Sequence, residues 1–252
     1  MADLKPSPVR GAAPEGAKDQ QSAARAVREM FTAIAPRYDL LNHLLSANVD
    51  KLWWRRAARA FSTILSRPDV RVLDLCCGTG DMAFALRRRG KDASITGVDF
   101  SRAMLELASR KSDATCSIHW IEADALRLPF PDHSFDLVTS AFGFRNLADY
   151  DAGLREIRRV LKPTGQCGIL EFSEPEGWLG KFYEVYFKAV LPRIGNWISG
   201  NNRAYAYLPA SVARFPQPEE MLERMKAAGF GQASWTPYTF SIAGLYRGQP
   251  SG

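Results

Sequence analysis

The sequence predicts a single doubly wound α/β domain built on a mainly parallel, Rossmann-like sheet. Short apolar runs alternate with segments whose apolar residues recur every three or four positions, which is the pattern of buried parallel strands separated by helices. A glycine-containing turn follows the first run and an aspartate ends the second. Ligands of such folds bind beyond the carboxyl ends of the strands, so these two features predict a binding site there.

The chain divides into a tail and one domain. Residues 1–24 hold almost no large apolar groups, so we expect them to form a flexible tail. The domain is expected over 25–248 and begins with a helical cap over 25–66, where apolar residues fall at helical spacing and Pro36 interrupts the pattern. A second helical segment is expected as an insertion on the substrate side, over 173–215.

The core elements follow in order. The apolar runs predict strands over 70–76, 95–99, 117–122, 135–140 and 167–172. A helix over 82–88 separates the first two strands, and Ser101 stands where it would cap the helix that follows the second. Another helix, around Leu154 and Ile157, is expected to stop at Lys162-Pro163-Thr164-Gly165.

The turn after the first strand carries the main functional signal. Gly78 and Gly80 let the backbone turn tightly and approach a ligand without a Cβ clash. Asp99 ends the next strand about 20 residues later, where a carboxylate can accept hydrogen bonds from both ribose hydroxyls of an adenosine. These residues therefore predict a nucleoside cofactor.

The glycine spacing does not decide which nucleoside binds. Gly78-x-Gly80-x-x-Ala83 also satisfies the dinucleotide fingerprint, so an NAD-dependent oxidoreductase stays an alternative. Two carboxylates favour another cofactor. Asp74, inside the first strand, could bind a ligand ammonium, and Asp124, after the third strand, could hold an adenine amino group.

Together with the 128–136 linker, these features resemble the motifs of class I S-adenosyl-L-methionine (SAM)-dependent methyltransferases. Further motifs, over about 27–246, resemble the ubiquinone/menaquinone-biosynthesis C-methyltransferase family. They are Tyr38-Asp39 with Asn42, Phe142-Gly143-Phe144-Arg145-Asn146, Leu161-Lys162-Pro163, Leu170-Glu171-Phe172-Ser173, Tyr205-x-Tyr207-Leu208-Pro209-x-Ser211-Val212 with Phe215-Pro216, and Ala228-Gly229-Phe230. Two positions depart from the family. Thr164 replaces the usual Gly, and Ala141 stands where some members have a cofactor-contacting Ser.

The resemblance implies a seven-stranded class I methyltransferase sheet and SAM as cofactor. It assigns the methionine part, the ribose and the adenine to three groups of residues, namely Asp74 with Gly78, Thr79 and Gly80, then Asp99, then Asp124 with Ala125. The family methylates a ring carbon of a prenylated hydroquinone. Its menaquinone branch acts on demethylmenaquinol and its ubiquinone branch on a methoxy-benzoquinol precursor. The Cys76-Cys77 variant of the glycine turn is more similar to menaquinone-type members.

The acceptor requires activation. A phenol with a pKa of about 10 costs roughly 4 kcal/mol to ionise at neutral pH, and a cation beside the oxygen can offset much of this cost in a dry pocket. Arg145 is the candidate cation, with a structural arginine that bridges loops as the alternative. Asn146 could orient the same oxygen, and Tyr207 could place the acceptor or remove its proton. The other candidates for acceptor binding are Tyr38, Asp39 and Tyr205.

Composition limits partners and compartment. The net charge is +6, but the basic clusters are typical of solvated helix faces and no RNA-binding signature is present, so nucleic acid is not expected. The four cysteines form no CxxC pair and the three histidines no ligand-like spacing. We therefore expect no disulfide or metal site, and a reducing cytoplasm.

A membrane span is not expected either, because no apolar run reaches the required length of about 18 residues. The apolar face that includes Trp178 and Phe182 has two readings: core, or a groove for a prenyl tail that touches the inner face of the membrane. A homodimer is left open. The remaining alternatives are a SAM methyltransferase for another phenolic, lipid or RNA acceptor, and a SAM-binding scaffold subunit of a quinone-synthesis assembly.

Overall fold

The computed structural model describes residues 9–35, 48–112, 117–173 and 202–251. Its centre is a seven-stranded sheet in the order β3-β2-β1-β4-β5-β7-β6. The strands are β1 (Arg71–Leu75), β2 (Ser94–Asp99), β3 (Ile118–Glu122), β4 (Phe135–Ala141), β5 (Leu161–Phe172), β6 (Phe230–Tyr238) and β7 (Ala243–Pro250). Strands β1 to β5 pair in parallel, and β7 runs antiparallel to β5 and β6. The predicted doubly wound, mainly parallel seven-stranded sheet is confirmed.

The order of the strands reverses between β1 and β4. From β1 the chain steps outward to β2 and β3, then returns to β4 on the other side of β1. The two central strands pair through Val72 with Leu137 and Asp74 with Thr139. A crevice opens at such a reversal beyond the carboxyl ends of the strands, so the topology alone places the binding site above β1 and β4.

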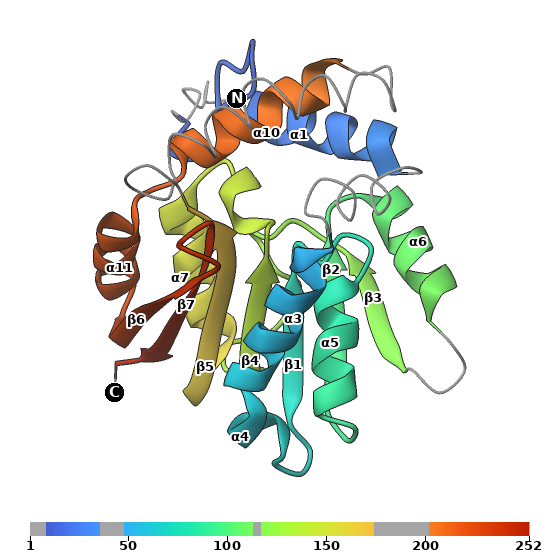
Figure 1. The fold of residues 1–252 in the computed structure, drawn as a ribbon, viewed down its shortest axis with the longest axis vertical. Helices are drawn as coiled ribbons and strands as arrows, with labels where there is room; N and C mark the ends of the chain where they lie inside the picture. Colours follow the sequence, from blue (N-terminus) through green and yellow to red (C-terminus); the bar gives the residue numbers. More distant parts are fainter. Residues whose placement is uncertain (1–8, 36–47, 113–116, 174–201, 252) are drawn as a thin grey trace, which may run out of the picture.

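Helices cover both faces of the sheet (Figure 1). On one face, α3 (Val49–Ala60), α4 (Ser62–Leu65) and α5 (Asp81–Arg89) pack into one apolar core. On the other, α7 (Tyr150–Val160) and α11 (Pro218–Ala227) form a second core. Helix α6 (Arg102–Lys111) contacts β2 and β3.

Two helices far apart in the sequence lie across the carboxyl edge of the sheet. These are α1 (Gln20–Ile34) and α10 (Asn202–Arg214), which contact each other above the strands (Figure 1). The cap therefore differs from the expected 25–66. Helix α3, within that range, packs on the sheet because its Trp53, Trp54, Ala57 and Ala58 form a buried face. The expected insertion contributes α10 to the cap, and its residues 174–201 lie outside the described part.

The N-terminal segment is more ordered than the expected tail of 1–24. Helix α1 begins at Gln20, after a capping box in which Asp19 and Ser22 accept each other's backbone N–H groups. Upstream, the N–H of Arg10 donates to the carbonyl of Ala148 over 3.2 Å, and that of Ala12 to Leu147 over 2.7 Å. Main-chain hydrogen bonds hold residues 10–12 in place, and amino-acid composition does not predict such bonds.

The start of β5 also differs from the expectation. The segment Lys162-Pro163-Thr164-Gly165, expected as a stop between helix and strand, lies inside β5, which begins directly after α7. The pairing with β4 shifts register between Phe135 and Leu137, and this irregularity accommodates the proline within the sheet.

Candidate active site

A pocket lies at the reversal point of the sheet. The turns after β1 to β4, the end of β5, and helices α1 and α3 line it. It brings together eight residues expected from the sequence: Asp74, Gly78, Thr79, Asp99, Asp124, Ala125, Arg145 and Asn146. Residues after β2 and β3 stand on one side of β1, and residues after β4 and β5 on the other. The pocket therefore has two halves that meet at Asp74.

Asp74 is a fully buried carboxyl group at the centre of the pocket. Its Oδ1 accepts a hydrogen bond of 2.9 Å from Thr139 Oγ1, across the β1–β4 pairing. Its Oδ2 has no hydrogen-bond partner among the described groups. Burial raises the pKa of Asp74 to about 7, against the opposing effect of the Thr139 hydrogen bond. A cationic ligand group at Oδ2 would restore the ionised form.

Asp99 fixes the glycine turn. Its Oδ2 accepts from the backbone N–H of Gly78 over 2.9 Å, and its Oδ1 from that of Ser101 over 2.8 Å. Burial raises its pKa to about 6 despite these two hydrogen bonds. Ser101 precedes α6 as expected, but its hydroxyl bonds to Thr32 Oγ1 of α1 instead of capping the helix. Asp99 thus joins the turn after β1 to the start of α6.

Gly78 and Gly80 are favoured in the turn for different physical reasons. Both adopt positive φ, +54° at Gly78 and +89° at Gly80, which favours glycine. A Cβ on Gly80 would also lie 2.6 Å from the ring of Trp120 in β3. A Cβ on Gly97 of β2 would lie 2.3 Å from the same ring. The expected close approach to a ligand suits Gly78, which lines the pocket, whereas Gly80 makes room for Trp120.

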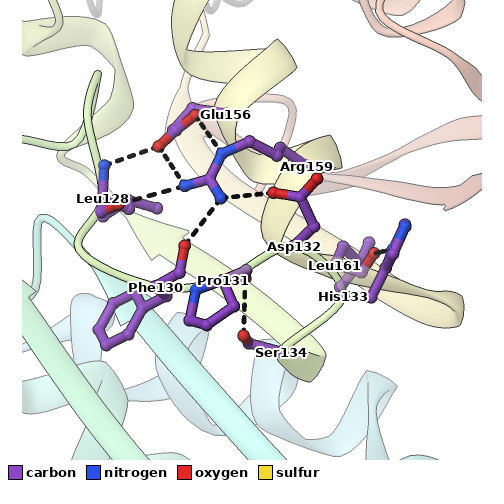
Figure 2. Close-up of polar contacts among 9 residues, drawn as sticks. All are labelled: Leu128, Phe130, Pro131, Asp132, His133, Ser134, Glu156, Arg159 and Leu161. Atoms are coloured by element: carbon purple, nitrogen blue, oxygen red, sulfur yellow. Dashed lines mark hydrogen bonds and ion pairs between the residues drawn. The ribbon is translucent and has the colours of Figure 1, made fainter.

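The linker after β3 is held by an ion-pair network with α7 (Figure 2). The guanidinium of Arg159 donates to the carbonyls of Leu128 and Phe130 and to Asp132, and it pairs with Glu156. Glu156 accepts in turn from the N–H of Leu128 over 2.7 Å, and its hydrogen bonds to Arg159 lower its pKa. This network anchors the chain just after Asp124 and Ala125.

Aromatic rings form the wall on the β4–β5 side. Phe142 and Phe172 line the pocket, and their ring centroids lie 4.5 Å apart. Trp53 of α3 packs against both, at 5.7 and 6.0 Å. Trp54, from the same helix, lines the pocket beside them. This half of the pocket suits a planar, apolar molecule.

Arg145 forms a buried ion pair at the edge of that wall. Its backbone N–H donates to Glu171 Oε1 over 3.0 Å, and its Nη1 to Glu171 Oε2 over 2.9 Å. Nη1 also donates to the carbonyl of Phe142, and Nε to Ser211 of α10 over 3.2 Å. Glu171 has no solvent exposure and Arg145 only 5%. These contacts join the ends of β4 and β5 to α10, as expected of an arginine that bridges structural elements.

Asn146 is also joined to the cap. The hydroxyl of Tyr207 donates to Asn146 Oδ1 over 3.1 Å. Acceptance at Oδ1 leaves the Nδ2–H groups of Asn146 as donors. Burial raises the pKa of Tyr207 to about 12. Tyr207 therefore stays protonated near neutral pH and acts as a donor.

Asp50 is a pocket residue that was not predicted from the sequence. Its carboxylate lines the pocket from the first turn of α3, is 4% exposed, and accepts from the N–H of Lys51 over 2.8 Å. A lone acid in a tryptophan- and arginine-rich helix was the available signal. Of the other expected residues, Tyr38 and Asp39 lie outside the described residues, and for Tyr205 only the backbone, within α10, is described.

Comparison with known proteins places the chain in a family. The model of the ubiE/COQ5 methyltransferase family matches residues 16–249. The chain belongs to this family. A demethylmenaquinone methyltransferase of Deinococcus radiodurans is 51% identical, over 91% of this chain and 95% of its own. One of Thermus thermophilus is 50% identical, over 87% and 99%, and a Geobacter sulfurreducens protein named ubiquinone/menaquinone biosynthesis C-methyltransferase UbiE is 45% identical, over 88% of each chain.

Solved structures support the same fold. A SAM-dependent methyltransferase of Thermotoga maritima superposes with a TM-score of 0.64 at 20% identity, over 89% of this chain and all of its own. A Haloferax volcanii methyltransferase solved with the activator Trm112 gives 0.62 at 20% identity, over 88% and 98%. The ubiE/COQ5 chain described here is thus a class I SAM-dependent methyltransferase.

The pocket fits the cofactor. SAM carries a cationic ammonium group. The buried Oδ2 of Asp74, which has no hydrogen-bond partner within the described part of the chain, is a suitable acceptor for it. Asp99 stands at the end of β2, where ribose hydroxyls can donate to its remaining lone pairs. Asp74 and Asp99 therefore suit the ammonium of the methionine part and the hydroxyls of the ribose.

Proposed function

We propose that this ubiE/COQ5 methyltransferase methylates a ring carbon of a prenylated hydroquinone, with demethylmenaquinol as the acceptor. The relatives that carry the name demethylmenaquinone methyltransferase support this substrate at up to 51% identity over nearly the whole chain. One structural observation carries the proposal. The half of the pocket beyond Asp74 is walled by Phe142, Phe172 and Trp54, which suit a flat naphthoquinol ring.

The cofactor half has a defined set of roles in this proposal. Asp74 accepts a hydrogen bond from the ammonium of the methionine part. The turn at Gly78, Thr79 and Gly80 contacts the rest of that part. Asp99 accepts from the ribose hydroxyls. Asp124 and Ala125 bound the adenine. The Oδ1 atom of Asp124 accepts from the N–H of Leu126 over 2.9 Å, and its second oxygen is the acceptor for the adenine amino group in this proposal.

The chain's own residues activate the acceptor. Bound SAM supplies a methyl group that needs no further activation, whereas the quinol carbon becomes strongly nucleophilic only as its hydroxyl loses a proton. The cost of that ionisation is roughly 4 kcal/mol at neutral pH for a phenol. A base that takes the proton and donors that stabilise the oxyanion must offset this cost.

Asp50 accepts the proton of the quinol hydroxyl in this proposal. Once the ring carbon has taken the methyl group, that carbon loses its own hydrogen as a proton, the ring regains its aromaticity and the quinol oxygen is reprotonated, so that one net proton is released. Asp50 is the described carboxylate that reaches the pocket from α3, next to Trp54 in the aromatic half. In this proposal Tyr207 is a donor and Asp50 is the base, because burial raises the pKa of Tyr207 to about 12 and so favours its protonated form. The Tyr207 hydroxyl orients Asn146, whose Nδ2–H groups donate to the developing oxyanion.

Arg145 acts on the oxyanion from the pocket wall and also by positioning. Its positive charge is shared with Glu171 at 2.9 Å, which weakens its field at a distance. Its bonds to Phe142 and Ser211 hold the aromatic wall and α10 in place. Both effects depend on the same buried guanidinium.

Several finer roles extend the proposal. Tyr38, Asp39 and Tyr205 help to place the acceptor, as the family motifs imply. The enzyme binds peripherally to the inner face of the membrane that holds the prenyl tail of its substrate. Two copies of the chain form a homodimer.

Methyl transfer to the reduced quinone tests the proposal. The protein is incubated with methyl-labelled SAM and either chemically reduced demethylmenaquinol or the oxidised quinone, and label is followed into lipid. We expect label in the reduced sample alone, because only the quinol has a hydroxyl to ionise. An Asp99→Asn variant serves as the cofactor-site control. Transfer to a methoxy-benzoquinol precursor but not to demethylmenaquinol would move the enzyme to the ubiquinone branch, and transfer to neither would refute the quinol proposal.

A further inference from the structure

The described surface exposes two large apolar side chains, and they occur together. Leu52 of α3 is 59% exposed, and Phe240, at the tip of the β6–β7 hairpin, is 75% exposed. The indole N–H of Trp53, the residue after Leu52, donates to Thr239 Oγ1, one residue before Phe240, over 2.8 Å. One turn along α3, the guanidinium of Arg56 stacks 4.1 Å from the centroid of the Tyr238 ring. The exposed face of α3 therefore runs beside the hairpin tip.

The hairpin presents Phe240 outward on a rigid support. Thr239, Phe240 and Ser241 all adopt left-handed backbone angles, with φ of 45°, 54° and 65°, which residues other than glycine rarely adopt. Besides the Trp53 bond, the hydroxyl of Ser173 donates to the carbonyl of Ser241 over 2.6 Å. A phenylalanine fixed in solvent by a strained turn has no role in packing the core, so the strain indicates a role at the surface.

This apolar pair lies within a positively charged surface. The exposed side chains of α3, apart from Leu52 and Ala60, are all basic: Lys51, Arg55, Arg56 and Arg59. Asp50 is the single acidic residue of that helix, and it is buried. The hairpin segment 230–250 contains no acidic residue. Apolar tips surrounded by cations match the interface of a bilayer that contains anionic lipids.

The same surface adjoins the aromatic half of the pocket. Trp53 lies between it and the pocket wall, since its ring packs on Phe142 and Phe172, both of which line the pocket. No helix in the described ranges is long and apolar enough to cross a bilayer. A lipid acceptor that stays in a bilayer would reach the aromatic half of the pocket from the side on which this surface lies.

We propose that the basic face of α3 and the tip of the β6–β7 hairpin dock on an anionic lipid bilayer, with Leu52 and Phe240 inserted among the acyl chains. Docking there sets the aromatic wall of the pocket beside the lipid, so that a quinol head group enters while its prenyl tail stays in the membrane. This inference rests on the proposed quinol substrate, but vesicle binding tests it independently of turnover.

Flotation of the full chain with vesicles is the test. We expect binding to vesicles that contain phosphatidylglycerol and little binding to phosphatidylcholine alone. Leu52→Ser with Phe240→Ser should weaken binding at least about tenfold, whereas Phe240→Trp should retain it. Arg55→Gln and Arg59→Gln should each weaken it about fivefold. Arg110→Gln, an exposed arginine on α6, is the matched control and should not change binding.

Turnover separates this inference from the proposed function. The Leu52→Ser, Phe240→Ser variant should methylate a short-tailed quinol in detergent at the normal rate and a long-tailed quinol in anionic vesicles with a raised KM. A wild-type protein that binds vesicles but methylates no quinol would refute the proposed function alone. Unchanged vesicle binding by the serine variant would overturn the proposal that this surface docks on a bilayer. The proposal would also fail if the serine substitutions abolished self-association or RNA binding and left vesicle binding intact.

Discussion

Both carboxylate oxygens of Glu171 accept hydrogen bonds from Arg145, Oε1 from its backbone N–H and Oε2 from its guanidinium. Both side chains are almost completely removed from solvent. Removing one partner of such a pair leaves an uncompensated buried charge, a change that typically costs about 3–5 kcal/mol. The pair is therefore a point where stability and the shape of the pocket are coupled.

Glu171→Gln should lower the stability of the fold by a few kcal/mol, roughly 3 by this reasoning, because the charge of Arg145 loses its partner. Chemical denaturation of the free protein measures the change. Glu220→Gln is the matched control, since it breaks an exposed pair with Arg224 and should cost less than about 1 kcal/mol. Equal losses in the two variants would contradict a special role for the buried pair.

Asp74 should make cofactor binding depend on pH. Its folded pKa of about 7 lies above the ordinary 3.8, so burial favours the protonated form. The stability of the ligand-free protein that comes from this group is therefore full below about pH 4 and is lost as pH rises toward 7. Asp99, raised to about 6, acts in the same direction. The bound ammonium favours ionised Asp74, so S-adenosylhomocysteine should bind more tightly at pH 7.5 than at about pH 5.5.

Asp74→Asn tests whether Asp74, rather than Asp99, binds the ammonium group of the cofactor. We expect S-adenosylhomocysteine, which carries the ammonium, to bind at least about tenfold more weakly to this variant. Methylthioadenosine, which lacks the ammonium, should lose much less. Calorimetric titration of both ligands measures the difference. Equal losses would show that Asp74 supports the turn but does not meet the ammonium.

Asp50→Asn should slow methyl transfer while it preserves cofactor affinity, because the proposed base acts on the acceptor alone. The residual rate should rise with pH toward the phenol pKa of about 10, as bulk hydroxide replaces the missing base. Quinol turnover across pH, alongside titration with S-adenosylhomocysteine, checks both parts. A rate loss with the wild-type pH profile would assign Asp50 to substrate placement and remove it as the base.

Gly97→Ala should destabilise the sheet by about 1–3 kcal/mol, as overpacking does, because the new Cβ would lie 2.3 Å from the Trp120 ring. In a Trp120→Leu background the same substitution should cost clearly less, since the clash is with the ring. Unfolding of the four proteins in this double-mutant cycle gives the coupling energy. Additive effects would show that Trp120 is not the obstacle.

Removal of residues 1–12 should weaken cofactor binding several-fold. It deletes the hydrogen bonds from Arg10 and Ala12 to Ala148 and Leu147, which line the pocket. Faster amide exchange around 147–149 should accompany the loss. Unchanged cofactor affinity and unchanged amide exchange after the deletion would show that these main-chain bonds do not support the pocket.

The sequence by itself determined the five parallel strands of the sheet and the cofactor half of the site, whereas the number of seven strands followed from the family resemblance and the positions of β6 and β7 were not predicted. Apolar runs of strand length, the glycine turn and the carboxylates at strand ends are local patterns, because buried parallel strands and their terminal turns restrict residue type at short range. Asp74, Gly78, Asp99 and Asp124 were therefore predicted at positions that do line one pocket.

Only the tertiary structure decided the rest, because it depends on contacts between distant segments. Arg145 pairs with Glu171, 26 residues away, and Trp53 with Thr239, 186 residues away. The spacing of apolar residues along the chain cannot predict such pairings. The order of residues 10–12 comes from main-chain bonds, which side-chain composition does not encode. Asp50 became a candidate base only when α3 packed against the sheet and brought its first turn to the pocket.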